Sequence, residues 1–140
     1  MTKAKRSLGT KLKIGAASTA IPVGGVTSID GIENSADTID VTTLDSDGGY
    51  RDFIAGFKDA GDVSLEGFLY TEDAGQVKLS ELFKSGEISD FSIVFPEEMG
   101  AQWDFKGVVT GFGTSASMEE AITFTSSIKV SGEPILTLSA

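Results

Sequence analysis

Two strand-like runs in this chain flank a long segment that fits neither a strand nor an ordinary polar loop. The runs cover residues 38–44 and 62–70, and the segment between them spans residues 45–60. It carries four large apolar side chains among charged neighbours: Tyr50, Phe53, Ile54 and Phe57. Connections longer than about 12–15 residues are usually functional or disordered, and large apolar groups argue against disorder because they gain by leaving water. We therefore expect a long inter-strand loop that packs on another copy of the chain.

The composition excludes several kinds of catalytic and metal-binding chemistry. With 140 residues, the chain fits one domain and can bury about 68–70% of its unfolded surface, so it needs no metal or disulfide to fold. It contains no histidine and no cysteine, which removes the commonest general base, the commonest metal ligand and all thiolate chemistry. The serines lack a histidine to activate them. We expect a protein that is not an enzyme and that uses no cofactor or metal.

Two sequence patterns resemble ligand-binding motifs but do not fit them. A calcium loop that starts at Asp45 would need a ligand at its fifth position, where Gly49 stands, and a glycine at its sixth, where Tyr50 stands. The glycine-rich run at 107–113 is not followed by the Lys-Ser/Thr of a phosphate-binding loop. We interpret the first as a solvated turn and the second as glycines of a strand.

Charge is distributed unevenly along the chain. Residues 1–13 hold five of the eleven basic residues, and no acid precedes Asp30. The other six bases stand against all 21 acids. The negative electrostatic field of these acids repels nucleic acid. It either keeps the protein soluble or lines a wall past which DNA moves without binding. No apolar run approaches the roughly 18 residues of a membrane span, and no signal peptide is apparent, so we expect no membrane insertion.

Glycine-punctuated alternating runs predict a β-rich domain. The expected strand regions are Lys11–Ile14, 20–32, 38–44, 62–70, 90–95, 101–113, 120–131 and 135–138. A turn at Gly132-Glu133-Pro134 would separate the last two. One helix is expected over 73–85, with an apolar stripe of Val77, Leu79, Leu82 and Phe83 and with Gly86 as its C-cap. A single helix among strands covers one face or one end of a sheet.

Several pieces of the sequence, in order, resemble one family. The central pieces are TIDVTTLDS at 38–46, GYRDFI at 49–54, GFKD at 56–59 and GDVSLEG at 61–67. They resemble the central signature of the major tail tube proteins of long, non-contractile-tailed bacteriophages. Residues 9–12 and 25–31 are similar to the first third of that family, and residues 128–132 with Pro134 are similar to its last hairpin.

The resemblance implies a mainly β fold, a β-sandwich or split barrel with one flanking helix and a long inter-strand loop. It implies a structural virion protein whose hexameric rings stack into a tube around a DNA-conducting channel. The loop would reach a neighbouring ring or subunit, and double-stranded DNA would pass without specific binding. The implied partners are further copies and the tape measure, tail terminator and tail tip proteins. The implied location is the virion tail, assembled in the host cytoplasm. The chain ends before the decorating immunoglobulin-like domain of some members, so no such domain is expected.

Three groups of candidate residues follow. Those of the inter-subunit loop, 45–60, are Leu44, Asp45, Tyr50, Phe53, Ile54 and Phe57. Those of the channel wall are the acids Asp40, Asp62, Glu66 and Asp104. Those of a flexible basic N-terminal segment, residues 1–10, are Lys3, Lys5 and Arg6. The alternative is a monomeric β-sandwich that binds a surface or a carbohydrate. It would need an aromatic platform, for which the exposed strand faces offer Phe68, Tyr70 and Phe112.

Overall fold

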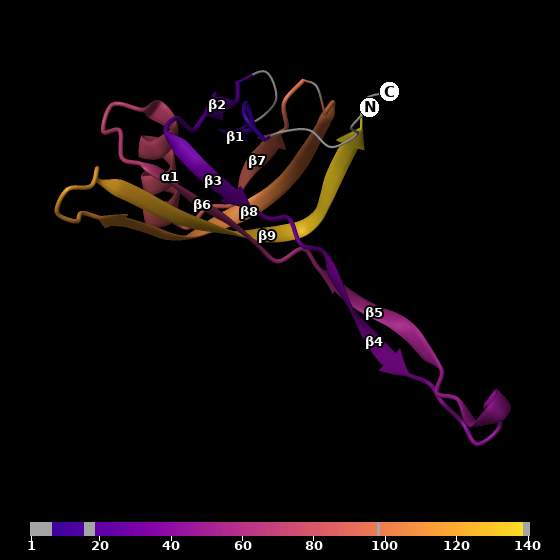
Figure 1. Ribbon diagram of the computed structural model, residues 1–140. Coiled ribbons are helices and arrows are strands. Elements are labelled where there is room, and N and C mark those ends of the chain that lie inside the picture. Colours follow the sequence, from indigo (N-terminus) through magenta and orange to yellow (C-terminus); the bar gives the residue numbers. More distant parts are fainter. Residues whose placement is uncertain (1–6, 16–18, 98, 139–140) are drawn as a thin grey trace.

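One curled antiparallel sheet and one helix form the body of the molecule in the computed structural model, which describes residues 7–15, 19–97 and 99–138 (Figure 1). The sheet has seven strands in the order β2-β1-β7-β8-β9-β6-β3. Their bounds are β1 Lys11–Ile14, β2 Ile21–Pro22, β3 Val26–Asp30, β6 Asp62–Phe68, β7 Ser89–Val94, β8 Ala101–Ser115 and β9 Thr123–Leu138. The sheet is curled into a half-barrel, which confirms the prediction of a mainly β, split-barrel fold with one helix.

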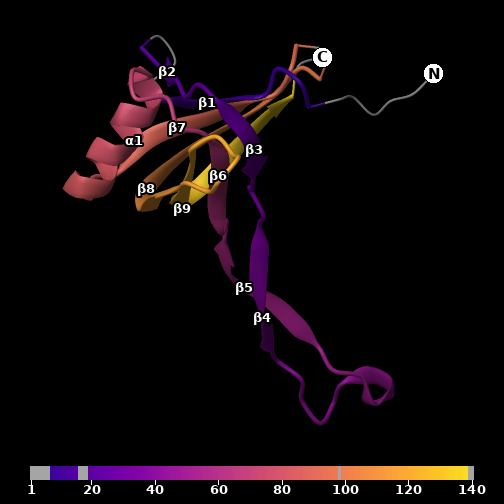
Figure 2. The ribbon, with the colours of Figure 1, turned by 60° about the vertical axis from the view of Figure 1, so that its left-hand side comes forward.

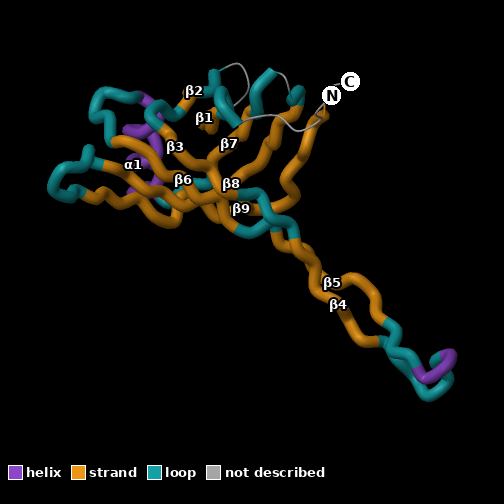
Figure 3. Tube along the Cα trace, in the orientation of Figure 1, coloured by secondary structure: helices purple, strands orange, loops and turns teal. Residues whose placement is uncertain are grey.

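A second, two-stranded sheet leaves the body as a long projection (Figures 1 and 2). It pairs β4, Ser35–Asp40, with β5, Phe53–Asp59, and a short 3₁₀ turn, η1 at Asp47–Gly49, lies near its tip (Figure 3). We call residues 35–59 the arm. The prediction of a loop over 45–60 was therefore wrong for its second half, because Phe53–Asp59 is a strand. The strand predicted before this loop, 38–44, is likewise shifted to Ser35–Asp40.

The core lies on one face of the large sheet. The side chains that are almost completely buried include Leu12, Val63, Leu79, Phe91, Ile93, Phe124 and Ile128. On β6, Val63, Leu65 and Gly67 alternate with exposed residues, as the sequence predicts for a half-buried strand. Only glycine fits at position 107, because a Cβ there would lie 2.6 Å from Ile128 Cγ2. The interpretation of residues 107–113 as part of a strand is confirmed, and Gly107 permits the close approach of the neighbouring strand.

The helix α1, Ala74–Ser85, covers the core with Leu79 and Leu82. Asp73 is its N-cap and accepts a hydrogen bond from Gln76 N, while Gly86 ends the helix at φ 70°. The predicted stripe is only half correct, because Val77 and Phe83 are exposed. The inward positions beside the two leucines belong to Gly75 and Gln76 instead.

Gln76 is buried, and its side chain connects three segments. Its Oε1 accepts from Tyr70 N at 2.8 Å, and its Nε2 donates to Gly24 O at 2.8 Å and Phe68 O at 2.9 Å. Buried backbone groups are costly when unpaired. The amide therefore satisfies backbone groups that the sheet ladder leaves open where β6 ends.

Two expectations near the C-terminus were wrong. Gly132-Glu133-Pro134 is not a turn, since β9 continues through it and pairs with β8 on both sides. The irregularity is absorbed as a register shift between Asp104 and Lys106 on β8. A second shift, between Val109 and Gly111, turns Phe112 toward the core, where it stacks on Phe124 with ring centroids 5.9 Å apart. Phe112 is therefore not on the exposed face of the sheet.

Candidate assembly interface

The arm is exposed along its whole length. Of residues 35–59, all except the half-buried Ser46 and Gly56 are exposed. Its large apolar side chains are nonetheless numerous: Ile39, Val41, Leu44, Tyr50, Phe53, Ile54 and Phe57. Leu44 is as exposed as in an unfolded chain, and Phe57 is 90% exposed. Contiguous apolar surface of this kind marks interaction sites. Five of the seven were predicted from the sequence, and Ile39 and Val41 were not, because they fell within the expected strand 38–44 rather than the expected loop.

Both faces of the arm are apolar. Residues opposite each other on paired strands share a face, so Ile39 and its partner Ile54 lie on one side. On β5, Phe53 directly precedes Ile54 and so points to the other side. A strand pair that merely covered its own core would be apolar on one face only. The arm thus has the surface of an element enclosed by other molecules on both sides.

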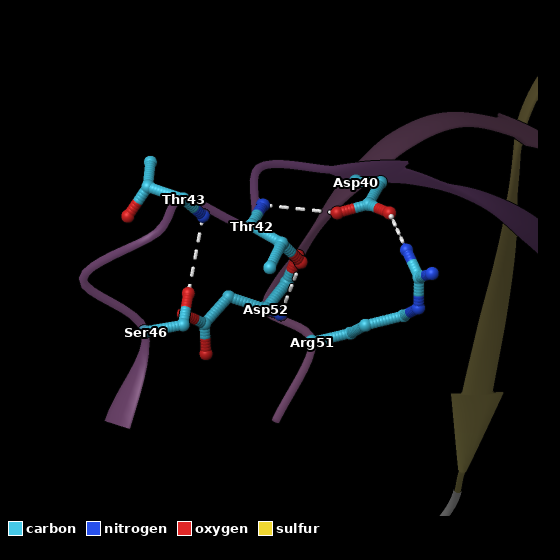
Figure 4. Close-up of polar contacts among 6 residues, drawn as sticks. All are labelled: Asp40, Thr42, Thr43, Ser46, Arg51 and Asp52. Atoms are coloured by element: carbon cyan, nitrogen blue, oxygen red, sulfur yellow. Dashed lines mark hydrogen bonds and ion pairs between the residues drawn. The ribbon is translucent and has the colours of Figure 1, made fainter. Parts of the chain in front are cut away.

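Polar contacts fix the shape of the arm tip. Figure 4 shows the six residues that make them: Asp40, Thr42, Thr43, Ser46, Arg51 and Asp52. Asp40 accepts from Thr42 N at 2.9 Å and from Arg51 Nη1 at 2.9 Å. Hydrogen bonds from Thr42, with a smaller contribution from Arg51, lower the pKa of Asp40. An isolated two-stranded hairpin is marginally stable in water, so these contacts favour one conformation of a segment that the body does not support.

At the tip, side-chain hydrogen bonds join the segment after β4 to the segment before β5. Asp52 N donates to Thr42 Oγ1 at 2.8 Å, and Ser46 Oγ donates to Asp52 Oδ2 at 3.0 Å. Thr43 N donates to the same Ser46 hydroxyl at 3.1 Å (Figure 4). No role was predicted for these residues from the sequence. Asx-type and hydroxyl contacts over short separations would have been the signal for them.

The root of the arm is joined to the body by an ion pair. Lys129 Nζ, on β9, lies 3.0 Å from Asp59 Oδ1, and Gly61 N donates to the same carboxylate at 2.7 Å. These groups lower the pKa of Asp59, the Gly61 amide contributing most, and Asp59 in turn raises the pKa of Lys129. Immediately after this pair, Ala60 is buried. The direction in which the arm leaves the body is thus set by contacts on both sides of Asp59.

The four candidate wall acids do not lie together. Asp62, Glu66 and Asp104 are exposed, on strands of the large sheet, at positions that alternate with core residues. Asp40 belongs to the arm and pairs with Arg51. Lysines are interleaved with the acids of the sheet, and Lys129 Nζ approaches Asp62 Oδ1 to 4.0 Å. The exposed sheet face is therefore mixed in charge and rich in hydroxyl groups, rather than purely acidic.

The proposed residues of the basic N-terminal segment, Lys3, Lys5 and Arg6, lie outside the described residues. Within the described ranges, no group of three or more acidic, histidine or cysteine side chains is placed to hold a metal ion. The helix of the described chain is too short and too polar to cross a membrane.

Comparison with known proteins agrees with this geometry. A family model described as lambda phage tail tube protein, TTP, matches residues 16–137. None of the curated proteins matches the chain. Among solved structures, the tail of an empty gene transfer agent particle, refined with helical C6 symmetry, is 21% identical, with a TM-score of 0.78 over 98% of this chain and 100% of that one.

Two further structures have a similar fold. The SPP1 tail tube is 14% identical, with a TM-score of 0.70 over 96% of this chain and 80% of that chain. The PVC sheath–tube complex of an extracellular contractile injection system is also 14% identical, with a TM-score of 0.74 over 99% and 95%. The family match extends over most of the sequence, including the whole arm and the large sheet from β2 onward. The chain therefore belongs to the lambda phage tail tube protein family and is a structural tail tube protein of phage-like particles.

Proposed function

We propose that copies of this chain form hexameric rings that stack into a tube, and that the arm of each copy is enclosed by copies in the neighbouring ring. The observation that carries this proposal is the arm itself, which is apolar on both faces and exposed along its length. A tube needs two complementary patches on each subunit, because its contacts are heterologous and repeat along an axis. The C6 symmetry applied to the gene transfer agent tail supports six subunits in a ring.

Phe53→Asp tests the role of the arm. Phe53 is 54% exposed, so the variant should keep the fold of the subunit and fail to polymerise. Phe83→Asp, on α1, is the matched control, since the same residue is replaced at similar exposure, 46%. Negative-stain microscopy at increasing protein concentration, with circular dichroism as the check of folding, gives the result. Tubes formed by folded Phe53→Asp protein would contradict the proposed contact.

The polar face of the large sheet is proposed to line the channel. Its hydroxyls and mixed charges would let a duplex slide, because tight binding needs many unopposed lysines or arginines. Asp62, Glu66 and Asp104 would then meet the DNA, while Asp40 serves the arm. Glu66→Lys and Asp104→Lys should leave tubes intact and slow DNA delivery by reconstituted particles. Delivery at the normal rate would remove these positions from the wall.

The wider role follows from the same proposal. The tube would conduct the genome without specific binding, would join the tape measure, terminator and tip proteins, and would assemble in the host cytoplasm before it enters the virion tail. No catalytic role is proposed. The alternative, a carbohydrate-binding module, would need an aromatic platform of Phe68, Tyr70 and Phe112. Phe112 is not available for it, since it stacks on Phe124.

A further inference from the structure

A groove lies on the body at a distance from the arm. Its volume is about 610 Å³, and it is formed by residues 7–10, by β3 and by the turn between β7 and β8. Its apolar lining consists of Leu8, Val26, Ile29, Phe95, Pro96 and Met99. Pockets of about 300–1,000 Å³ accept a drug-sized ligand, so the groove has room for a few side chains of a protein partner.

The rim of the groove carries two exposed apolar side chains. Leu8 is 73% exposed and Met99 is 45% exposed. Beneath them, Val26, Ile29 and Phe95 are half-buried and pack on the core. The floor is therefore anchored to the core while the rim is open to solvent, which is the arrangement of a preformed docking site.

The position of the groove matches an arm that arrives from another copy. In Figures 1 and 2 the arm leaves the lower end of the body, whereas the turn between β7 and β8 lies at the upper end. When copies follow one another head to tail, the arm of one points at the groove end of the next. A second hollow, of about 570 Å³, is lined by Lys58, Ala60 and Glu133 at the root of the arm. That hollow lies at the wrong end for such an arm.

The charge of the two surfaces is compatible with this geometry. The arm carries six acids and two bases, and the residues that line the groove carry no charged side chain. Like charges placed opposite each other disfavour a complex, and the groove lining presents none to an acidic arm. The arm of a second copy thus offers apolar side chains to an uncharged, partly apolar groove.

We propose that the groove between residues 7–10, β3 and the β7–β8 turn receives the arm tip of a second copy, with Leu44 and Tyr50 entering it. The inference rests on the proposed function, since it names the receptor for the arm. The polar contacts of the tip hold Leu44 and Tyr50 outward before docking, which lowers the entropy cost of binding. Each copy is then both donor and receptor, and the contact repeats along the tube.

Leu8→Glu and Met99→Glu test the receptor. Both place a carboxylate where an acidic, apolar tip should dock, and both replace exposed side chains. Each should raise the concentration needed for assembly about 30-fold, the effect of a hot-spot loss of about 2 kcal/mol. Val77→Glu, on α1 at a matched exposure of 44%, should assemble normally. If the groove variants polymerise like Val77→Glu while Phe53→Asp does not, the groove is wrong and the proposed function stands.

Mixing the two kinds of defective subunit gives a second readout. An arm variant, Phe53→Asp, keeps its groove, and a groove variant, Met99→Glu, keeps its arm. Below the raised assembly concentrations of both variants, neither should form tubes alone. Rings of one variant mixed with rings of the other should form complexes of no more than two layers, because one joint is intact and the next is not. Sedimentation velocity distinguishes these from long tubes. Absence of any mixed complex would overturn the assignment of the groove.

Disulfide capture tests the same contact without depending on polymerisation. The chain has no cysteine, so an engineered pair is read without background. The double variant Tyr50→Cys, Met99→Cys, oxidised with glutathione disulfide, should give a ladder of covalent multimers on a non-reducing gel. Tyr50→Cys with Val77→Cys is the control and should give none. An equal ladder from both pairs, or none from either, would refute docking of the tip in the groove.

Discussion

Two phenylalanines in this chain should respond to the same substitution in opposite ways. Phe124 is completely buried between the strands of the large sheet, and Phe57 is 90% exposed on the arm. Replacing Phe124 by alanine removes core packing and leaves a cavity. Replacing Phe57 by alanine removes nothing from the interior of the isolated subunit. It removes a side chain that, in the proposed tube, would lie against another copy.

The sizes of the two effects follow from burial. A buried Phe→Ala change costs about 3–5 kcal/mol, which for a chain of this size lowers Tm by about 10–25 °C. An exposed change stays within about 0.5 kcal/mol, a shift of no more than about 3 °C. At an interface, loss of a hot-spot side chain costs at least about 2 kcal/mol, which raises the critical concentration for assembly about 30-fold. Phe57→Ala should therefore keep its Tm and lose its tubes.

Calorimetry on dilute, unassembled protein measures the first quantity, and light scattering against concentration measures the second. Phe124→Ala serves as the control for the thermal measurement, since its Tm should fall while the Tm of Phe57→Ala should not. The reasoning would be refuted if Phe57→Ala lowered the Tm of the unassembled subunit as far as Phe124→Ala does. That result would mean that the arm folds back onto its own body in solution.

Three other predictions concern the connections within the subunit and its N-terminus. Gln76→Leu should destabilise the fold by about 2–4 kcal/mol in thermal unfolding, because it leaves backbone groups such as Tyr70 N unpaired. The lowered pKa of Asp59 means that its pair with Lys129 is complete above the ordinary aspartate pKa of about 4 and is lost as pH falls through the lower folded value. Proteolysis of the arm root should therefore rise only in that acid range, and in the Asp59→Asn variant it should be high at every pH. Deleting residues 1–10 should weaken assembly and reduce its sensitivity to salt, and a truncated chain that assembles equally well at all salt concentrations would contradict this.

The sequence predicted the body well because there one face of each strand is buried. On β6 and β9, apolar residues such as Val63, Leu65, Phe124 and Ile128 alternate with polar ones, and the structure buries the apolar set. The helix ends were also predictable, since Gly86 is needed for the left-handed turn after Ser85. Alternation is informative in these elements because the partner that covers the apolar face is part of the same chain.

The errors lie where that condition fails. β5 has Phe53 on one face and Ile54 on the other, and a register shift lies between Ala55 and Lys58, so no regular alternation marks it as a strand and it resembled an apolar loop. On β8, a register shift reverses the inward and outward alternation of side chains before Phe112, and no residue type in the sequence predicts such a shift. The first failure is the more informative one. A strand that is apolar on both faces lacks the pattern of a strand buried on one face by its own chain, and in the proposed assembly other molecules would complete its burial. The place where the pattern fails in this sequence therefore coincides with the surface proposed to hold the tube together.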